Sequence, residues 1–336
     1  MSKVTSLEVA RRAGVSQSAV SRVFTPGASA SAKTVEKVKR AAEELGYRPN
    51  VLARAMVSGK SRIIGLVVAY LENQFYPVAL ELLSNALQKR GYHLLIFTAP
   101  NSTDGVDQVI EDLMDYQVDG IIAASVSLSS PLAKRARAAG VPVVLFNRGQ
   151  EGGRFSSVTS TNVAGGRAIA EHLIRTGHRR IAHITGWQGS QTGQARARGF
   201  EMALKAANMT PFAMVDGMYR RGVAAECTRQ LLAGTRPDAI FVGNDHMAFA
   251  VLDEIRAKGL EPGRDISVIG FDDVPQAAWG AYDLTTYRQP VNRMVEATVA
   301  LMLKQIETGL SPAQKIEIEG RLILRGSVHQ KEGVAP

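Results

Sequence analysis

The sequence predicts a small all-α domain followed by an α/β core that has two lobes and parallel sheets. Two observations lead to this fold class. The first sixty residues contain short amphipathic helices separated by glycine, and they hold most of the positive charge. From residue 61 onwards, short apolar runs alternate with helical segments, a pattern typical of parallel sheets wrapped by helices.

The composition is that of an ordinary globular protein and excludes several other classes. The 336 residues are 45% hydrophobic and 21% charged, and a chain of this length forms two or three domains. The single cysteine, Cys227, excludes a disulfide framework and a cysteine-rich zinc site. The first residues lack the apolar segment of a signal peptide, and no apolar run reaches membrane-spanning length. We therefore expect a cytoplasmic protein with no membrane partner.

Positive charge is concentrated near the amino terminus. Residues 1–60 hold 11 lysines and arginines against 4 glutamates and no aspartate, which is +7 of the formal +9. A local basic excess suits a polyanion, because contacts with phosphates release counterions. Charge alone does not distinguish this interpretation from a solvated basic face.

Two helices joined by a glycine turn are predicted at the start of the chain. Thr5 or Ser6 caps the first, Gly14 supplies the turn, and Ser16 caps the second. The apolar side chains of the second helix face the first helix. Four polar side chains are left on the outer surface: Gln17, Ser18, Ser21 and Arg22. This pattern is a helix-turn-helix, whose second helix enters the major groove of DNA.

The polar residues of the second helix are the candidate DNA readers. Ser18 and Arg22 lie one helical turn apart, so both can point into one groove, and they are the best candidates for base contacts. Gln17 is a further candidate for a base edge, and Ser21 for a phosphate. The expected DNA contacts in this region are Thr5, Ser16, Gln17, Ser18, Ser21 and Arg22.

A third helix and a short hinge follow. Ser31 caps the third helix, Gly46 ends it, and its apolar side chains pack behind the other two helices. Asn50 then caps the segment VLARAMV, residues 51–57. This segment is too short to be a stable helix alone and is apolar on most sides, so it needs a partner.

These segments resemble the headpiece and hinge of the LacI/GalR family of bacterial transcription regulators. The matching phrases are AGVSQSAVSRVF, SAKTVEKVKRAAEELGYRPN and ARAM. In that family the hinge folds on DNA, and two copies wedge a leucine into the minor groove at the centre of the operator. Met56 stands at the matching position and is an adequate apolar wedge. The resemblance thus adds Asn50, Ala53 and Met56 to the expected DNA contacts.

Seven apolar runs in the rest of the chain are predicted as buried strands. They are IIGLVV (63–68), YHLLIF (92–97), DGIIAAS (119–125), VPVVLF (141–146), RIAHIT (180–185), DAIFVG (238–243) and DISVIGF (265–271). Helices such as VALELLSNALQKRG separate them, and VTSTNVAGG at 158–166 is interpreted as a crossover. These strands are too many for one small sheet, so two similar lobes with a cleft between them are expected.

The resemblance extends over this core, which in the family is similar to periplasmic sugar-binding proteins. The matching phrases are NVAGGRAIAEHLIRTGHRRIAHITG, ARARGF, RPDAIFVGNDHMA and GRDISVIGFDD. The implied domains are a DNA-binding headpiece (1–49), a hinge helix (50–60) and an effector-binding and dimerisation core (61–336). Within the core, lobe 1 spans about 61–160 and 290–320, and lobe 2 spans about 161–289 and 321–330.

Side chains at the predicted strand ends form the candidate effector site, because open α/β proteins bind ligands there. The site implied by the resemblance consists of Asn73, Phe75, Tyr76, Asn147, Arg148, Arg196, Tyr219, Asn244, Asp272 and Gln289. Their chemistry suits a polyol, since Asp272 accepts hydrogen bonds from vicinal hydroxyls and Arg196 donates to oxygens. An aromatic ring among them can stack on a sugar or a nucleobase, although Phe75 and Tyr76 could equally be core aromatics. Arg148 beside Arg196 would suit an anionic sugar or sugar acid.

No catalytic, cofactor or metal motif accompanies these residues in the sequence. Phosphate-binding loops, dinucleotide-binding glycine motifs, nucleophile elbows and HExxH are all missing, and the six histidines are dispersed. We therefore expect a homodimeric, ligand-responsive repressor of carbohydrate-metabolism genes that binds a palindromic DNA operator and is not an enzyme. Two alternatives share the α/β core: a solute-binding protein for sugar uptake, which would need export, and a sugar-active enzyme.

Overall fold

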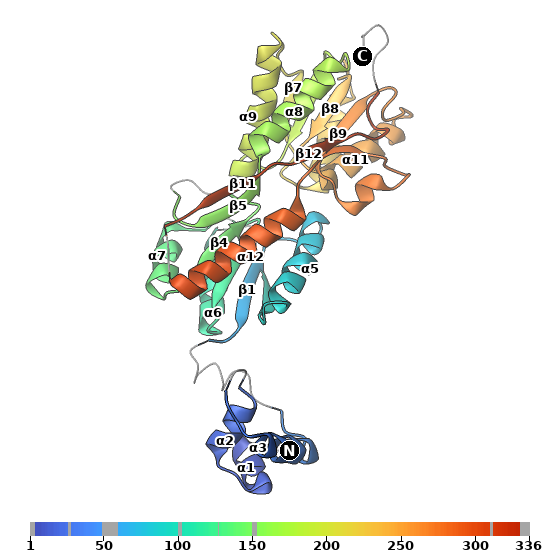
Figure 1. The fold of residues 1–336 in the computed structure, drawn as a ribbon. Coiled ribbons are helices and arrows are strands. Elements are labelled where there is room, and N and C mark those ends of the chain that lie inside the picture. The colour runs from blue at the N-terminus through green and yellow to red at the C-terminus, as the bar shows by residue number, and fades with distance from the viewer. Residues whose placement is uncertain are drawn as a thin grey trace. The chain divides into compact units, whose positions relative to one another are not determined.

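The computed structural model describes residues 4–25, 28–48, 60–99, 103–126, 128–149, 153–309 and 312–329. These residues belong to two units, which divide after Ser61 (Figure 1). Within the ranges described, no helix is both long and apolar enough to cross a membrane.

In the part of the first unit that the structure describes, α1 (Ser6–Ala13), α2 (Gln17–Val23) and α3 (Ala32–Leu45) pack around a small apolar core (Figure 1). Each helix contributes to one cluster of buried side chains: Val9, Ala10, Val20, Val38, Ala41 and Ala42. Because every helix is short, this shared core stabilises them more than their intrinsic helix propensity does.

Polar caps fix where the helices of the first unit begin and end. The Thr5 hydroxyl accepts from the backbone N–H of Glu8, and the Glu8 carboxylate accepts from the backbone N–H of Thr5 at 2.6 Å, which forms a capping box. Gly14 ends α1 in the left-handed conformation, and Ser16 caps α2 by accepting from the N–H of Ala19. The two caps set the turn between α1 and α2, as the sequence predicts.

The second unit contains two six-stranded sheets. The first has the order β11-β5-β4-β3-β1-β2 and is parallel throughout. The second has the order β12-β10-β9-β8-β6-β7, in which only β12 runs antiparallel to its neighbour. The strands are β1 (Ile63–Val68), β2 (His93–Thr98), β3 (Gly120–Ala124), β4 (Val143–Phe146), β5 (Ser156–Ser160), β6 (Ile181–Thr185), β7 (Ala213–Asp216), β8 (Ala239–Val242), β9 (Ser267–Asp272), β10 (Thr285–Arg288), β11 (Lys315–Ile318) and β12 (Arg321–Ile323).

Helices cover both faces of each sheet. They are α5 (Phe75–Gln88), α6 (Thr103–Asp115), α7 (Ser130–Ala138), α8 (Asn162–Arg175), α9 (Gln191–Ala206), α10 (Arg221–Leu231), α11 (Asp245–Ala257) and α12 (Val291–Thr308), with a short 3-10 helix at Pro275–Ala278. On the first sheet, α5 and α12 lie together on one side (Figure 1), and Ile122 packs on that side. The next residue, Ile121, packs towards α6 and α7. This alternation is why the strands read as continuous apolar runs.

The second sheet is buried in the same way. Ile240 and Val242 of β8 pack with α11, whereas Ala239 and Phe241 pack with α8 and α9. The chain passes from the first sheet to the second directly after β5, at Thr161, which lies inside the crossover that the sequence predicts.

The sequence pattern identified seven strands correctly and missed five, namely β5, β7, β10, β11 and β12. β5 is the clearest case, because its sequence SSVTS is polar although all five residues are buried. Its side chains have partners: the Ser156 hydroxyl accepts from Gln305 Nε2 at 2.8 Å, and the Ser160 hydroxyl donates to Gln289 Oε1 at 2.8 Å. A strand whose burial depends on hydrogen bonds gives no hydrophobic signal.

Candidate effector site and DNA-binding surface

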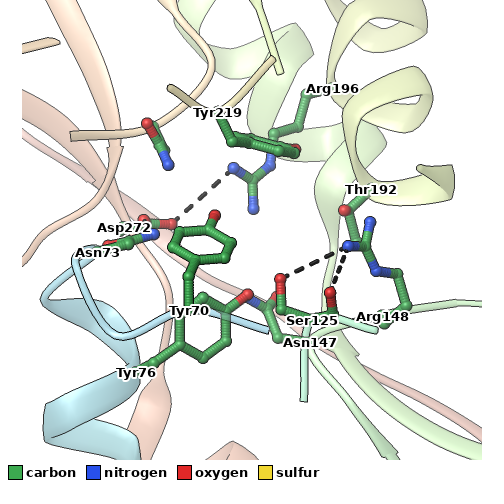
Figure 2. Close-up of a pocket in the computed structure, with 11 residues that line it drawn as sticks. Tyr70, Asn73, Tyr76, Ser125, Asn147, Arg148, Thr192, Arg196, Tyr219 and Asp272 are labelled. Carbon is green, nitrogen blue, oxygen red and sulfur yellow. Dashed lines mark hydrogen bonds and ion pairs between the residues drawn. The ribbon is translucent and has the colours of Figure 1, made fainter. Parts of the chain in front are cut away.

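A polar cavity lies between the carboxyl ends of the two sheets (Figure 2). Segments that follow strands of the first sheet contribute Tyr70, Asn73, Tyr76, Ser125, Asn147 and Arg148. Segments at or beyond strand ends of the second sheet contribute Thr192, Arg196, Tyr219, Asn244 and Asp272. In both sheets the strand order reverses beside a central strand, β1 or β6, and such switch points are where open α/β sheets bind ligands.

Several cavity residues have unusual backbone conformations. Ser125, Asn147, Tyr219 and Asp272 have positive φ angles of 60°, 53°, 55° and 130°. Such a conformation costs about 1–3 kcal/mol for a residue other than glycine, so it persists only where the surroundings fix it. Each of these residues stands at or near a strand end, where the chain turns so that the side chain faces the cavity.

Asp272 is the acidic centre of the cavity and is buried. Its carboxylate accepts from Gln289 Nε2 at 2.7 Å and from Asn73 Nδ2 at 3.2 Å, and Arg196 Nη1 lies 3.9 Å away. Burial raises the pKa of Asp272 to about 6, against the opposing effects of Arg196 and the two amides. Because this pKa lies below 7, the group is mostly a carboxylate at neutral pH and can accept hydrogen bonds from ligand hydroxyls.

Arg196 is held rigidly beside Asp272. Its Nε donates to Asn162 Oδ1 at 2.9 Å, its Nη1 donates to the carbonyl of Gly243 at 2.6 Å, and its guanidinium lies 3.6 Å from the centre of the Phe271 ring. These contacts come from three separate elements, so the guanidinium has a fixed orientation when a ligand arrives.

Two glycines bring α9, and with it Arg196, close to α8, and the two helices lie side by side in Figure 1. A Cβ atom on Gly166 would overlap the carbonyl oxygen of Arg196. A Cβ atom on Gly199 would likewise overlap the carbonyl oxygen of Val163. Only glycine permits this distance between the helices, so the glycines help to place the site.

Arg148 occupies another part of the cavity. Its Nη2 donates to the carbonyl of Ser125 at 2.8 Å, and its guanidinium lies 5.8 Å from the centre of the Trp187 ring. Three buried polar atoms nearby have no hydrogen-bond partner among the residues that the structure describes: Arg148 Nε, Asn147 Oδ1 and Tyr219 Oη. Unpaired buried polar atoms are costly, and they mark where a ligand can supply hydrogen bonds.

Asp245, at the start of α11, lies behind the cavity and is fully buried. Its Oδ1 accepts from the Thr286 hydroxyl at 2.6 Å, and its Oδ2 accepts from the backbone N–H of Val274 at 3.0 Å. Burial, followed by the negative charge of Asp272, raises the pKa of Asp245 to about 7. Sequence reasoning missed this residue, because an acid beside a helix start looks like an ordinary helix-dipole partner.

Most of the sequence-predicted effector residues come together. Eight line the cavity: Asn73, Tyr76, Asn147, Arg148, Arg196, Tyr219, Asn244 and Asp272. Phe75 does not line it, since its ring packs in the core against Phe146 and Tyr76. Gln289 lies behind Asp272, to which it donates, and does not line the cavity either.

The structure adds three cavity residues that sequence reasoning missed. Tyr70 lies two residues after the first predicted strand, and Ser125 is the last residue of the predicted strand 119–125, so their positions at strand ends are the signal in the sequence that points to them. Thr192 lies four residues before Arg196 on α9, and this spacing puts both on one face of the helix.

The polar face of α2 lies in the first unit and is exposed to solvent. Gln17, Ser18, Ser21 and Arg22 are all exposed, as are Thr5 and Ser16, which cap the helices. Gln17 Nε2 donates to the Ser6 hydroxyl at 2.9 Å, and the hydroxyls of Ser16 and Ser18 lie 2.9 Å apart. Within the described ranges Arg22 forms no ion pair, so its guanidinium is available to a partner. Asn50, Ala53 and Met56 lie outside the residues that the structure describes.

Comparison with known proteins places the chain in a family. The model for bacterial regulatory proteins of the lacI family matches residues 6–50, and a periplasmic binding protein-like domain matches residues 170–328. The chain is 30% identical over 327 residues to the ribose operon repressor of Escherichia coli (strain K12), covering 96% of this chain and 99% of the relative. The chain belongs to the lacI family.

Other relatives of this lacI-family protein are also regulators. The HTH-type transcriptional regulator CelR of Thermobifida fusca is 34% identical over 331 residues, with 95% of this chain and 96% of the relative covered. The solved structure of the lac repressor dimer bound to operator and the anti-inducer ONPF has a TM-score of 0.88 at 27% identity, and covers 98% of this chain and 100% of that chain. The fold class predicted from the sequence is thereby confirmed, as is the family resemblance.

Proposed function

We propose that this lacI-family regulator is a homodimeric repressor of carbohydrate-metabolism genes. It binds a palindromic operator, and a small sugar-like effector in the cavity changes its affinity for DNA. One observation carries the proposal: a single chain combines the exposed polar face of α2 with a cavity walled by aromatic and polar side chains. The names of relatives support it, since they include a ribose operon repressor and a CelR–cellobiose complex.

The proposed DNA-binding surface is centred on Ser18 and Arg22. Both are exposed on α2, one helical turn apart, and Arg22 can donate two hydrogen bonds to the major-groove edge of a guanine. Gln17 is a further base reader, and Ser21 contacts phosphate. The hinge residues Asn50, Ala53 and Met56 remain proposed contacts with the centre of the operator.

In the proposed effector site, one ligand contacts residues from both sheets. A ligand in the cavity contacts Arg148 after β4 and Asp272 at the end of β9, so its affinity depends on how the two halves of the second unit are arranged. A ligand that prefers one arrangement shifts the population towards it by its difference in affinity. We propose that this shift changes DNA affinity, and that the protein acts in the cytoplasm without catalysing a reaction.

The DNA-binding proposal is tested with the full chain. DNA fragments are first selected from a random pool by the wild type. Binding to a selected fragment and to a scrambled one is then measured by fluorescence anisotropy at one salt concentration. Arg22→Ala should weaken binding to the selected DNA by about 5- to 150-fold, equivalent to about 1–3 kcal/mol, with a much smaller effect on scrambled DNA.

Arg40→Ala is the matched control, because it removes one exposed arginine of the same unit from α3. It should reduce binding to both DNAs slightly and equally. Equal losses in Arg22→Ala and Arg40→Ala, or the failure of the wild type to prefer any DNA, would contradict the proposal.

A further inference from the structure

The effector cavity differs in charge from one side to the other. Arg148 and Ser125 lie on one side, and Asp272 and Asn73 lie on the opposite side (Figure 2). We propose that the natural effector is a polyhydroxy acid whose anionic group, a carboxylate or a phosphate, pairs with Arg148 while its hydroxyls meet Asp272. This inference rests on the proposed effector site and names its ligand class.

Arg148 is a buried cation that has no acidic partner among the described residues. The residue is 5% exposed, and within the described part of the chain no carboxylate lies within ion-pair distance of it. Its hydrogen bonds go to Ser125, whose carbonyl and hydroxyl are both neutral, at 2.8 and 3.5 Å. A buried charge without a counter-charge is costly, so a ligand that supplies a negative charge gains affinity here.

Two other arginines of the second unit that are largely shielded from solvent lie near carboxylates. Arg325 donates to Asp273 at 2.7 Å, and Arg196 lies 3.9 Å from Asp272 while also donating to Asn162. Arg148 differs from these two arginines, because no carboxylate of the described residues lies within ion-pair distance of it, and it faces the cavity. The lining holds two arginines and one aspartate, so a ligand with one negative charge balances the site.

The acidic side of the cavity sets the orientation of the ligand. Asp272 already accepts from Asn73 and Gln289, and its charge repels an anionic group on a ligand. Vicinal hydroxyls, in contrast, can donate to it. Tyr70 and Tyr219 also line the cavity, and their rings can cover the apolar face of a sugar chain or ring.

The test compares neutral sugars with their own acids on the full chain by titration calorimetry. The panel contains glucose, galactose and mannose, the corresponding aldonates and uronates, and the corresponding 1- and 6-phosphates. At least one acid should bind ten or more times as tightly as its neutral parent. Tighter binding of the aldonates or uronates would identify the anionic group as a carboxylate, and tighter binding of the sugar phosphates would identify it as a phosphate.

Arg148→Met should reduce the affinity for that acid by about 10- to 150-fold, because a hydrogen-bonded charge is removed. Arg148→Lys should retain part of the preference, which separates loss of charge from loss of folding. Arg137→Met is the matched control, since this exposed arginine of α7 does not line the effector cavity, and it should leave the affinity unchanged.

Three results would overturn the inference: a neutral sugar that binds as tightly as its acid, no acid bound at millimolar concentration, or equal effects of Arg148→Met and Arg137→Met. The first and third would leave the proposed regulator intact. Failure of the proposed function itself would instead show as the absence of sequence-specific DNA binding in the Arg22 experiment.

Discussion

The buried carboxylate of Asp245 makes the stability of the second unit depend on pH. Asp245 is fully buried, and its pKa is raised to about 7 by burial and by the charge of Asp272. In the unfolded chain an aspartate loses its proton at about pH 3.9. Between these values the folded state holds a proton on Asp245 that the unfolded state has lost, so the contribution of Asp245 to the free energy of unfolding falls as pH rises from about 4 to about 7.

The expected size of this effect follows from the two pKa values. At about 1.4 kcal/mol for each pH unit, ionising Asp245 in the folded protein costs about 4 kcal/mol once the pH exceeds 7. Asp245→Asn removes this cost and preserves the contacts, because an amide can accept from the Val274 N–H and donate to the Thr286 hydroxyl. As the pH rises from 4 to 8, the free energy of unfolding of the variant relative to that of the wild type should increase by about 4 kcal/mol.

Denaturant unfolding of the full chain, followed by tryptophan fluorescence, measures this difference. The only two tryptophans, Trp187 and Trp279, both belong to the second unit, so the signal excludes the first unit. Asp115→Asn is the control, because it removes an exposed carboxylate of α6 and should follow the wild-type curve. If the difference in unfolding free energy between the wild type and Asp245→Asn stays constant from pH 4 to pH 8, Asp245 does not have a raised pKa in the folded protein.

Three further substitutions have defined outcomes. Gly199→Ala forces a methyl group against the Val163 carbonyl. Urea unfolding should therefore show a free energy of unfolding lower by about 1–3 kcal/mol, and calorimetry should show weaker effector binding. Val20→Ala leaves a cavity in the small core of the first unit. Circular dichroism melts should show a free energy of unfolding lower by about 2 kcal/mol, and DNA binding should be weaker. An unchanged melting curve would argue against this core. Tyr219→Phe removes a buried hydroxyl that has no partner in the described part of the chain. The free energy of unfolding without ligand should therefore stay the same or rise by up to about 1 kcal/mol, while effector affinity falls. A clear loss of stability would show that the hydroxyl is already paired.

The local features of the fold could be predicted from the sequence because they depend on nearby residues. The Gly14 turn and the Ser16 cap each need only a few consecutive positions and occur where expected, and Thr5 is the one of the two predicted caps, Thr5 or Ser6, that begins α1. The central strands could be predicted as well, since strands buried on both faces are continuous apolar runs. β5 could not, because its serines are buried through partners such as Gln305, 149 positions away.

The candidate site was partly predictable for a related reason. Strand ends identify which residues can meet at the edge of a sheet, but not which way each side chain turns. Phe75 follows β1 and yet packs inwards against Phe146, whereas Tyr70 on the same connection lines the cavity. Asp245 was missed because its environment comes from Thr286 and Val274, which are distant in the sequence.

In the proposed regulator, the effector cavity controls DNA binding. The most direct test measures the affinity of the full chain for its selected DNA by fluorescence anisotropy, with and without a saturating concentration of the tightest ligand of the calorimetric panel. We expect the DNA affinity of the wild type to change by about 5- to 150-fold. Asp272→Asn, which alters the acceptor for ligand hydroxyls, should show no change at the same ligand concentration. If a ligand saturates the wild-type cavity and leaves the DNA affinity unchanged, the cavity does not control DNA binding.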